Sequence, residues 1–189
     1  MRTRAKHTRA RKQAGFTLIE ATVSMAVLAI GILSLAAIYT QGIFVANMAQ
    51  YDYIAEKKAE AAIETIFTAR DTKLITWAQI RNVTGSGNDG GVFLDGPQQL
   101  LDPGVDGLAG TADDNATQPD SVILGPGADG QLGTADDDVF RLSGMMTREI
   151  QIRDVLGEPN LRQITVVMSY QAGRLSRQYT LVSYSSAFA

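Results

Sequence analysis

The side chains that could do chemistry in this chain of 189 residues are mainly carboxylates, because cysteine is absent and histidine occurs once. The lack of Cys excludes disulfides, thiolate metal sites and cysteine nucleophiles. The one His, His7, lies in a basic N-terminal stretch, which nearly excludes His-based acid–base chemistry for the rest of the chain. The Asp and Glu side chains therefore remain as the candidates for binding.

Eleven Asp residues are concentrated in residues 82–140, a stretch of 59 residues without Lys or Arg that also holds 12 of the 18 Gly. A twelve-residue motif occurs twice there, since residues 103–114 and 126–137 match at nine of twelve positions. Carboxylates spaced by glycines suit Ca²⁺, which takes six to eight oxygen ligands around a tightly turned backbone. Like charges at this density also repel one another, so a bound cation would order the segment.

The first copy fits a calcium loop better than the second. Positions 1, 5, 6 and 12 of an EF-hand-like loop are occupied by Asp102, Asp106, Gly107 and Asp113. Position 3 is Gly104, however, no helices are predicted to flank the loop, and Gly125 replaces the first acid of the second copy. The composition also fits a solvated loop in which Asp and Gly make turns. The candidate Ca²⁺ ligands are Asp102, Asp106, Asp113, Asp114, Asp129, Asp136, Asp137 and Asp138.

The N-terminal part of the chain has a different composition. Residues 1–15 carry six basic side chains and no acid, whereas the remaining 174 residues carry 11 basic and 20 acidic ones, a net charge of −9. A body this acidic argues against direct nucleic-acid binding. Residues 21–51 then lack any formal charge, and about 20 apolar residues suffice to cross a bilayer as a helix. We predict a single membrane span with a cytoplasmic N-terminus, because the positive charges precede it.

Glu20 interrupts the beginning of this apolar run. An ionised carboxylate alone in a membrane helix costs about 3 kcal/mol on insertion scales. The side chain either lies close enough to the cytoplasmic interface to reach headgroups or water, or is neutralised by a cationic partner within the membrane. Glu20 by itself leaves both interpretations open.

A contiguous motif surrounds this residue: Gly15-Phe16-Thr17-Leu18-Ile19-Glu20. It follows a short basic leader, precedes an apolar helix, and resembles the signature of type IV prepilins and type II secretion pseudopilins. The resemblance implies that a prepilin peptidase cleaves after Gly15 and that the new amine of Phe16 is N-methylated. It also implies that Glu20 pairs with the Phe16 amine of a neighbouring subunit, and such a pair is buried at lower cost than either charge alone.

The same resemblance implies a structural filament subunit, not an enzyme, with no organic cofactor. The implied partners are prepilin peptidase, other pilin or pseudopilin subunits, the inner-membrane assembly platform and membrane lipid. The expected location is the inner membrane and then a periplasmic or cell-surface filament. Gly31-Ile32-Leu33 and residues 164–170 resemble the V-type minor pilins and the I-type pseudopilins of type II secretion.

The N-terminal segment also fits two kinds of signal sequence. An ordinary signal peptide could end after Ala36, where small residues fit a cleavage site, but an acid within its apolar core would be unusual. An unprocessed signal anchor would leave Gly15 and Glu20 unexplained. With such an anchor, the chain would be a single-pass, calcium-binding cell-surface protein that does not polymerise.

Two further patterns predict the helix and the strands that hold the N-terminal segment and the acidic stretch in place. Ala55, Ala59, Ile63 and Phe67 form one apolar stripe of an amphipathic helix, which we predict to continue to about Ile80. The final 45 residues alternate apolar and polar positions in three strands, with turns at 157–160 and 171–174, as in an antiparallel meander. Within the acidic stretch, the best strand candidates are 120–124 and 138–142.

The sequence therefore predicts an α+β protein with the pilin fold, in which a long N-terminal helix, membrane-spanning in its inner half, packs on a small C-terminal antiparallel sheet. The expected organisation is a cleaved leader (1–15), a transmembrane and polymerisation helix (16–45), an amphipathic outer helix (46–81), an Asp/Gly-rich loop with the duplicated motif (82–140) and a strand meander (141–189).

Overall fold

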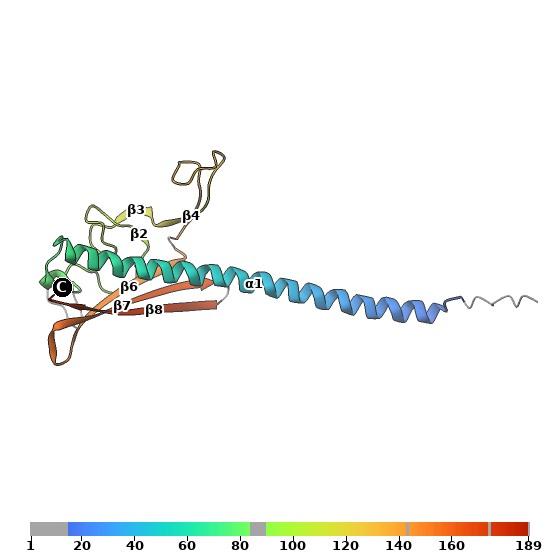
Figure 1. Ribbon diagram of the computed structural model, residues 1–189. Coiled ribbons are helices and arrows are strands. Elements are labelled where there is room, and N and C mark those ends of the chain that lie inside the picture. Colours follow the sequence, from blue (N-terminus) through green and yellow to red (C-terminus); the bar gives the residue numbers. More distant parts are fainter. Residues whose placement is uncertain (1–14, 84–89, 143, 174, 189) are drawn as a thin grey trace, which may run out of the picture. The chain divides into compact units, whose positions relative to one another are not determined.

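The computed structural model describes residues 15–83, 90–142, 144–173 and 175–188. The chain divides into two compact units, with the boundary between Val45 and Ala46. The helices are α1 (Leu18–Asp71) and the short 3₁₀ helix η1 (Trp77–Gln79). The strands are β1 (Gln98–Gln99), β2 (Leu101–Asp102), β3 (Asn115–Pro119), β4 (Ser121–Gly125), β5 (Asp138–Arg141), β6 (Met146–Val155), β7 (Glu158–Ala172) and β8 (Leu175–Ser186) (Figure 1).

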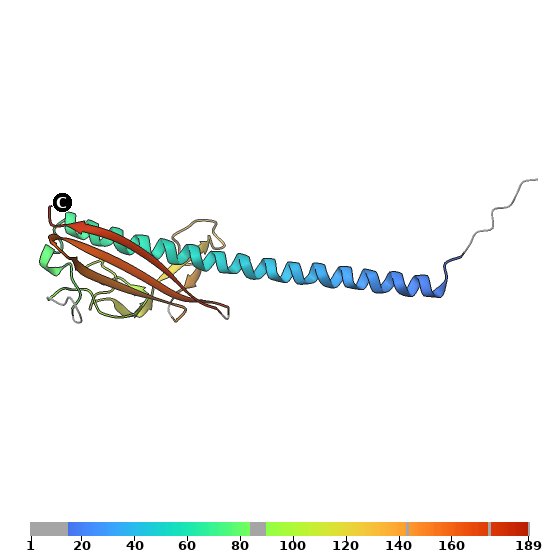
Figure 2. The ribbon, with the colours of Figure 1, turned by 90° about the horizontal axis from the view of Figure 1, so that it is seen from below.

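The second unit is built by packing the C-terminal part of α1 on a four-stranded antiparallel sheet (Figure 2). Four alanines lie among the buried residues of this part of the helix, which allows the sheet to approach closely: Ile54, Ala55, Ala59, Ala62, Ile63, Ile66 and Ala69. The facing side of β7 is buried at every second residue from Arg162 to Ala172, as the period of a strand requires. This confirms the predicted α+β fold, with a long apolar N-terminal helix packed against a small antiparallel sheet.

The sheet has the order β1-β6-β7-β8, so the predicted three-strand meander is present and is extended at one edge by β1. The first turn is tighter than predicted. It consists of Leu156 and Gly157, and Glu158, Pro159 and Asn160 already belong to β7. Gly157 adopts φ 84°, a left-handed conformation that a two-residue connection needs and that glycine adopts without strain.

The end of α1 differs from the sequence prediction, because the helix stops at Asp71 and not near Ile80. Lys73 adopts φ 59°, and two backbone hydrogen bonds close the end: Lys73 N–H to Arg70 O (3.0 Å) and Leu74 N–H to Ala69 O (2.8 Å). This is the Schellman pattern, which usually places Gly at the left-handed position. Because Lys occupies it here, and apolar residues continue to Ile80, the sequence carried no stop signal.

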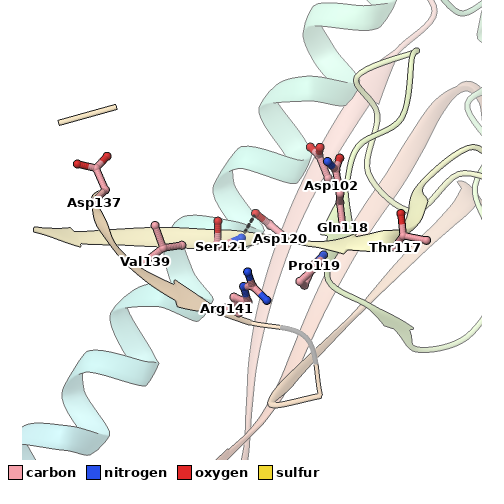
Figure 3. A pocket seen from close by; sticks show the side chains of 9 residues that line it. All are labelled: Asp102, Thr117, Gln118, Pro119, Asp120, Ser121, Asp137, Val139 and Arg141. Carbon is pink, nitrogen blue, oxygen red and sulfur yellow. Dashed lines mark hydrogen bonds between the residues drawn. The ribbon is translucent and has the colours of Figure 1, made fainter. Parts of the chain in front are cut away.

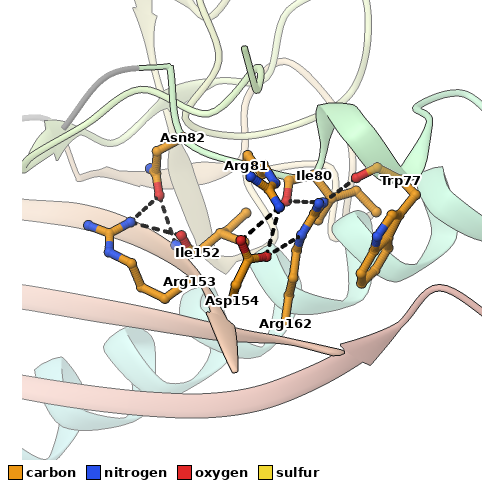
Figure 4. A network of polar contacts seen from close by, with 8 residues as sticks. All are labelled: Trp77, Ile80, Arg81, Asn82, Ile152, Arg153, Asp154 and Arg162. Atoms are coloured by element: carbon orange, nitrogen blue, oxygen red, sulfur yellow. Dashed lines mark hydrogen bonds and ion pairs between the residues drawn. The ribbon is translucent and has the colours of Figure 1, made fainter. Parts of the chain in front are cut away.

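The segment after α1 is joined to the sheet by a polar network (Figure 4). Arg162 of β7 donates to the carbonyl oxygens of Trp77 and Ile80, and its guanidinium lies 4.1 Å from the centre of the Trp77 ring. Asn82 acts as a substitute strand partner for β6. Its Nδ2 donates to Ile150 O (2.8 Å) and its Oδ1 accepts from Ile152 N–H (2.8 Å). These bonds satisfy buried backbone groups that no regular element pairs.

The acidic stretch contains two separate two-stranded ladders. β4 and β5 pair with each other, close to the predicted strands 120–124 and 138–142. The pairing of β2 with β3 was not predicted, since neither strand alternates in hydrophobicity. In Figure 1 the hairpin formed by β4 and β5 projects from the rest of the second unit and carries the second copy of the repeat at its end.

Candidate functional site

The N-terminal motif begins just before α1. Gly15, Phe16 and Thr17 have no regular secondary structure and are exposed, with Phe16 81% exposed. The bond between Gly15 and Phe16 therefore lies in non-helical backbone that an endopeptidase can reach. The basic leader itself lies outside the described residues.

Thr17 fixes where the helix begins. Its Oγ1 accepts a hydrogen bond from Glu20 N–H (3.3 Å), the N-cap contact that satisfies one otherwise unpaired amide. Glu20 thus lies in the first turn of α1, where a negative charge is favourable at the positive end of the helix dipole. Its side chain is exposed, and it forms no ion pair with any residue that the structure describes. The predicted partner, a neighbouring subunit's Phe16 amine, stays a prediction.

The surface of the first half of α1 is apolar on all sides. Its large hydrophobic side chains from Leu18 to Ile38 are between 56% and 84% exposed. This helix contains a stretch long and apolar enough to cross a membrane, which is consistent with a single-pass, membrane-anchored protein. Because no described part of the chain covers it, this surface requires lipid or other helices.

The two copies of the repeat fold into the same hydrogen-bonded loop. In the first copy, Asp106 Oδ1 accepts from Leu108 N–H (2.7 Å), while Asp113 accepts from Asp106 N–H (3.2 Å) and from the hydroxyl of Thr111 (2.7 Å). Asp114 accepts from Gly110 N–H (2.8 Å). The loop is therefore closed by its own carboxylates.

In the second copy, the equivalent bonds involve Asp129, which accepts from Gln131 N–H (2.8 Å), and Asp136, which accepts from Asp129 N–H (3.1 Å) and from Thr134 Oγ1 (2.8 Å). Asp137 accepts from Gly133 N–H (2.6 Å). The sequence identity of the repeat thus has a structural counterpart, bond for bond.

The two loops differ in their surroundings. Leu108 of the first loop is 1% exposed and belongs to the core, whereas its counterpart in the second loop, Gln131, is exposed. Ala109 of the first loop is likewise 7% exposed, and its counterpart Leu132 is 67% exposed. Burial raises the pKa of Asp106, and the nearby Asp113 carboxylate raises it further. The hydroxyl of Thr111 lowers the pKa of Asp113, as that of Thr134 does for Asp136.

The predicted Ca²⁺ ligands are brought together only in pairs. Asp106 lies beside Asp113, and Asp129 beside Asp136, while Asp114 and Asp137 each hold their own loop. Asp102 belongs to β2 and Asp138 begins β5. Among the residues described, no three carboxylates or histidines are grouped as a metal site. Calcium binding stays a prediction.

Asp102, which precedes the first copy of the repeat, and Asp137, which ends the second copy, do line one open polar pocket of about 590 Å³ (Figure 3). Asp120 and Arg141 line it as well. Asp120 does not face it as a free carboxylate, because it accepts from Lys58 Nζ of α1 (2.7 Å) and from Ser121 N–H (2.7 Å).

Sequence reasoning missed three features of this region. Thr111 and Thr134 could have been found, since both copies of the repeat retain the residue. The ion pair of Lys58 with Asp120 spans 62 residues and has no local signal. Arg148 occupies an inward position of β6, is 4% exposed, and its Nε and one Nη have no hydrogen-bond partner among the described residues.

Comparison with known proteins adds one finding. The sequence profile of the prokaryotic N-terminal methylation motif matches residues 10–36. This match supports a type IV pilin-like family and does not distinguish V-type from I-type members. No curated protein and no solved structure shows significant similarity to the chain.

Proposed function

We propose that the chain is a minor pilin or pseudopilin, a structural subunit of a type IV pilus-like or type II secretion filament. The observation that carries this proposal is the methylation motif at residues 10–36, placed where Gly15 and Phe16 are exposed and Glu20 lies in the first helical turn. Prepilin peptidase removes the leader, and the subunit is held in the inner membrane by its apolar helix until it enters the filament.

The exposed apolar half of α1 supports assembly with other pilin-like subunits. A helix that is hydrophobic all round needs an apolar environment, and a filament core of similar helices replaces lipid at little cost. Glu20 is then buried beside the cleaved amine of Phe16 in the next subunit. The pair forms only after cleavage, because an uncut chain has no amine at Phe16.

The direct test is the N-terminus of the protein extracted from membranes of a host that has a prepilin peptidase. Edman sequencing and intact mass are expected to show a chain that starts at N-methylated Phe16. A peptidase-deficient strain is the control and should yield the uncut chain. A mature chain that starts at Met1 or Ala37 in the competent host refutes the proposal.

The role of Glu20 is tested separately from cleavage. Glu20→Ala should leave membrane insertion intact and reduce incorporation into filaments, because the Phe16 amine of the next subunit loses its buried counter-ion. Thr22→Ala, a neighbouring exposed position, is the matched control and should assemble normally. Normal incorporation of the Glu20→Ala protein contradicts the pairing role.

Calcium binding by the duplicated loops is a second, independent proposal. It is supported by the absence of Lys and Arg from residues 82–140 and by the pairing of like charges at Asp106 and Asp113. A protein that binds Ca²⁺ but starts at Met1 would instead be a single-pass surface protein that does not polymerise.

A further inference from the structure

The four-stranded sheet runs alongside the C-terminal part of α1 (Figure 1 and Figure 2), and two side-chain contacts fix how β8 is placed along the helix. Near one end, Arg70 donates to Ser185 Oγ (3.0 Å). Near the other end, Arg177 pairs with Asp52 (2.7 Å). Between these two contacts, α1 and β8 each extend over about 26 to 27 Å, at about 1.5 Å per helical and about 3.3 Å per strand residue. The strand and the helix therefore stay in step.

This placement shows which part of α1 the beginning of β8 reaches. β8 begins at Leu175, about 7 Å beyond Arg177 in the direction of decreasing residue number along α1. Leu175 thus lies at the level of Met48, which is half-buried between exposed neighbours. Met146 pairs with Tyr170, so the start of β6 lies at the same end of the sheet. We call this end the proximal end; it comprises residues 144–146, 171–173 and 175–177.

The uncharged run of α1 matches the thickness of a whole bilayer. Residues 21–51 carry no formal charge. As a helix they extend over about 46 Å, compared with about 40 to 45 Å for a bilayer with both headgroup layers. Glu20 and Asp52 flank the run and then lie at the two membrane surfaces. The level of Met48, four residues before Asp52, falls within the headgroup layer on the side of the second unit.

The proximal end has the composition of a surface that contacts lipid headgroups. Apart from Arg177 its residues carry no charge, and Asp52 neutralises Arg177. Met145 is 39% and Leu175 is 50% exposed. Tyr53, which follows Asp52, is also exposed, and Tyr is enriched at membrane–water interfaces. A headgroup layer would cover these apolar side chains without taking up an unpaired charge.

The opposite end of the sheet has a different composition. Arg153, Asp154 and Glu158 surround the turn between β6 and β7. Leu156 in that turn is fully exposed, and a single exposed apolar residue is ordinary on a protein surface. Only the uncharged end of the sheet lies at the level where the helix enters the membrane. The continuity of this end with the membrane span favours lipid as the partner that covers it.

We propose that the proximal end of the sheet rests in the phospholipid headgroup layer, with Met145 and Leu175 inserted between the headgroups. The membrane then orients the second unit as well as anchoring the chain, because the sheet and the helix are held at the same surface. The proposal rests on the membrane span of α1 and does not depend on cleavage, methylation or filament assembly.

The test uses the full-length protein reconstituted into phosphatidylcholine vesicles whose lipids carry a nitroxide on the headgroup. Because the chain has no Cys, one introduced Cys can be labelled with a fluorophore that the nitroxide quenches at short range. Label at Leu175→Cys should be quenched at least about threefold more strongly than label at Leu156→Cys, at the opposite end of the sheet. Ile30→Cys, with the nitroxide on the acyl chains, is the control for insertion of the helix.

A matched pair of substitutions tests the apolar contact itself. With the fluorophore at Met145→Cys, Leu175→Asp should reduce headgroup quenching by about half or more, because a carboxylate favours water over the membrane. Leu156→Asp makes the same change at an exposed residue of the opposite end and should leave the quenching unchanged. Both positions are exposed, so both proteins should fold, as equal urea midpoints of Trp77 fluorescence would show.

Several results would overturn the proposal. One is equal quenching at Leu175→Cys and Leu156→Cys while Ile30→Cys is quenched, since the helix is then inserted but the sheet end is not in the headgroups. Another is an equal effect of the two Asp substitutions. Label at Leu175→Cys that is shielded from aqueous iodide but not quenched by the lipid would identify a second copy as the occupant. Absence of quenching at Ile30→Cys would reject the membrane span and the proposal with it.

Discussion

The duplicated loop provides an internal comparison, because the same glycine makes the same close contact in a copy that is anchored in the core by Leu108 and in an exposed copy. A Cβ on Gly104 would lie 2.2 Å from the backbone oxygen of Asp113, and one on Gly127 would lie 2.0 Å from that of Asp136. Neither distance is tolerated, so Gly104→Ala and Gly127→Ala should both open their loops. The consequences for stability should differ.

In the first loop, opening breaks the two hydrogen bonds that Asp113 accepts from Asp106 and Thr111, worth about 0.5 to 1 kcal/mol each. It also disturbs Leu108, which is 1% exposed, and burial of a Leu side chain contributes about 2 kcal/mol. We expect Gly104→Ala to lower the free energy of unfolding by about 2 to 4 kcal/mol. The second loop opens into solvent, so Gly127→Ala should leave the free energy of global unfolding unchanged within error.

The assay is urea unfolding of the full-length protein in detergent, followed by the fluorescence of Trp77, the only Trp in the chain. This residue lies in the second unit, where its ring contacts Arg162, and so it reports on that unit. Equal losses in the two variants, or an unchanged midpoint for Gly104→Ala, would show that the first loop is not part of the cooperative core.

Three further predictions concern the same unit. Lys73→Gly should raise the free energy of unfolding by about 0.5 to 1 kcal/mol in the same urea assay, because Gly adopts the left-handed conformation at the end of α1 without strain; a loss of stability would refute this. Burial, together with the hydrogen bond to Asp52, raises the pKa of Tyr170 to about 12. The stabilisation that the neutral Tyr170 side chain provides should therefore be complete below pH 10 and lost as the pH rises toward 12. Tyr170→Phe should lack this part of the alkaline loss of stability, and an alkaline unfolding profile identical to that of the unchanged protein would refute the prediction. If the loops bind Ca²⁺, calorimetric titration should show heat and the melting temperature should rise with Ca²⁺ but not with the same concentration of Mg²⁺; no heat and no shift would remove the calcium proposal.

Local signals in the sequence were sufficient for the elements whose residues alternate or repeat. The stripe from Ala55 to Phe67 predicted the buried face of α1, and the alternation in residues 164–170 predicted the central strand of the sheet. The end of α1 was predicted wrongly, because a Schellman turn with Lys at its left-handed position looks like continuing helix. β2 and β3 could not be predicted, since their short polar segments are held by partners and not by a pattern of their own.

The sequence by itself determined the processing motif, the apolar segment and the existence of two equivalent acidic loops, because each is encoded by residues close together in the chain. Only the tertiary structure decided that one loop is anchored in the core while the other is exposed, that Lys58 contacts Asp120, and that β8 is left with a free edge. These features depend on contacts between segments that are far apart in the sequence. The packing of α1 on the sheet, and not local conformational preference, determines those contacts.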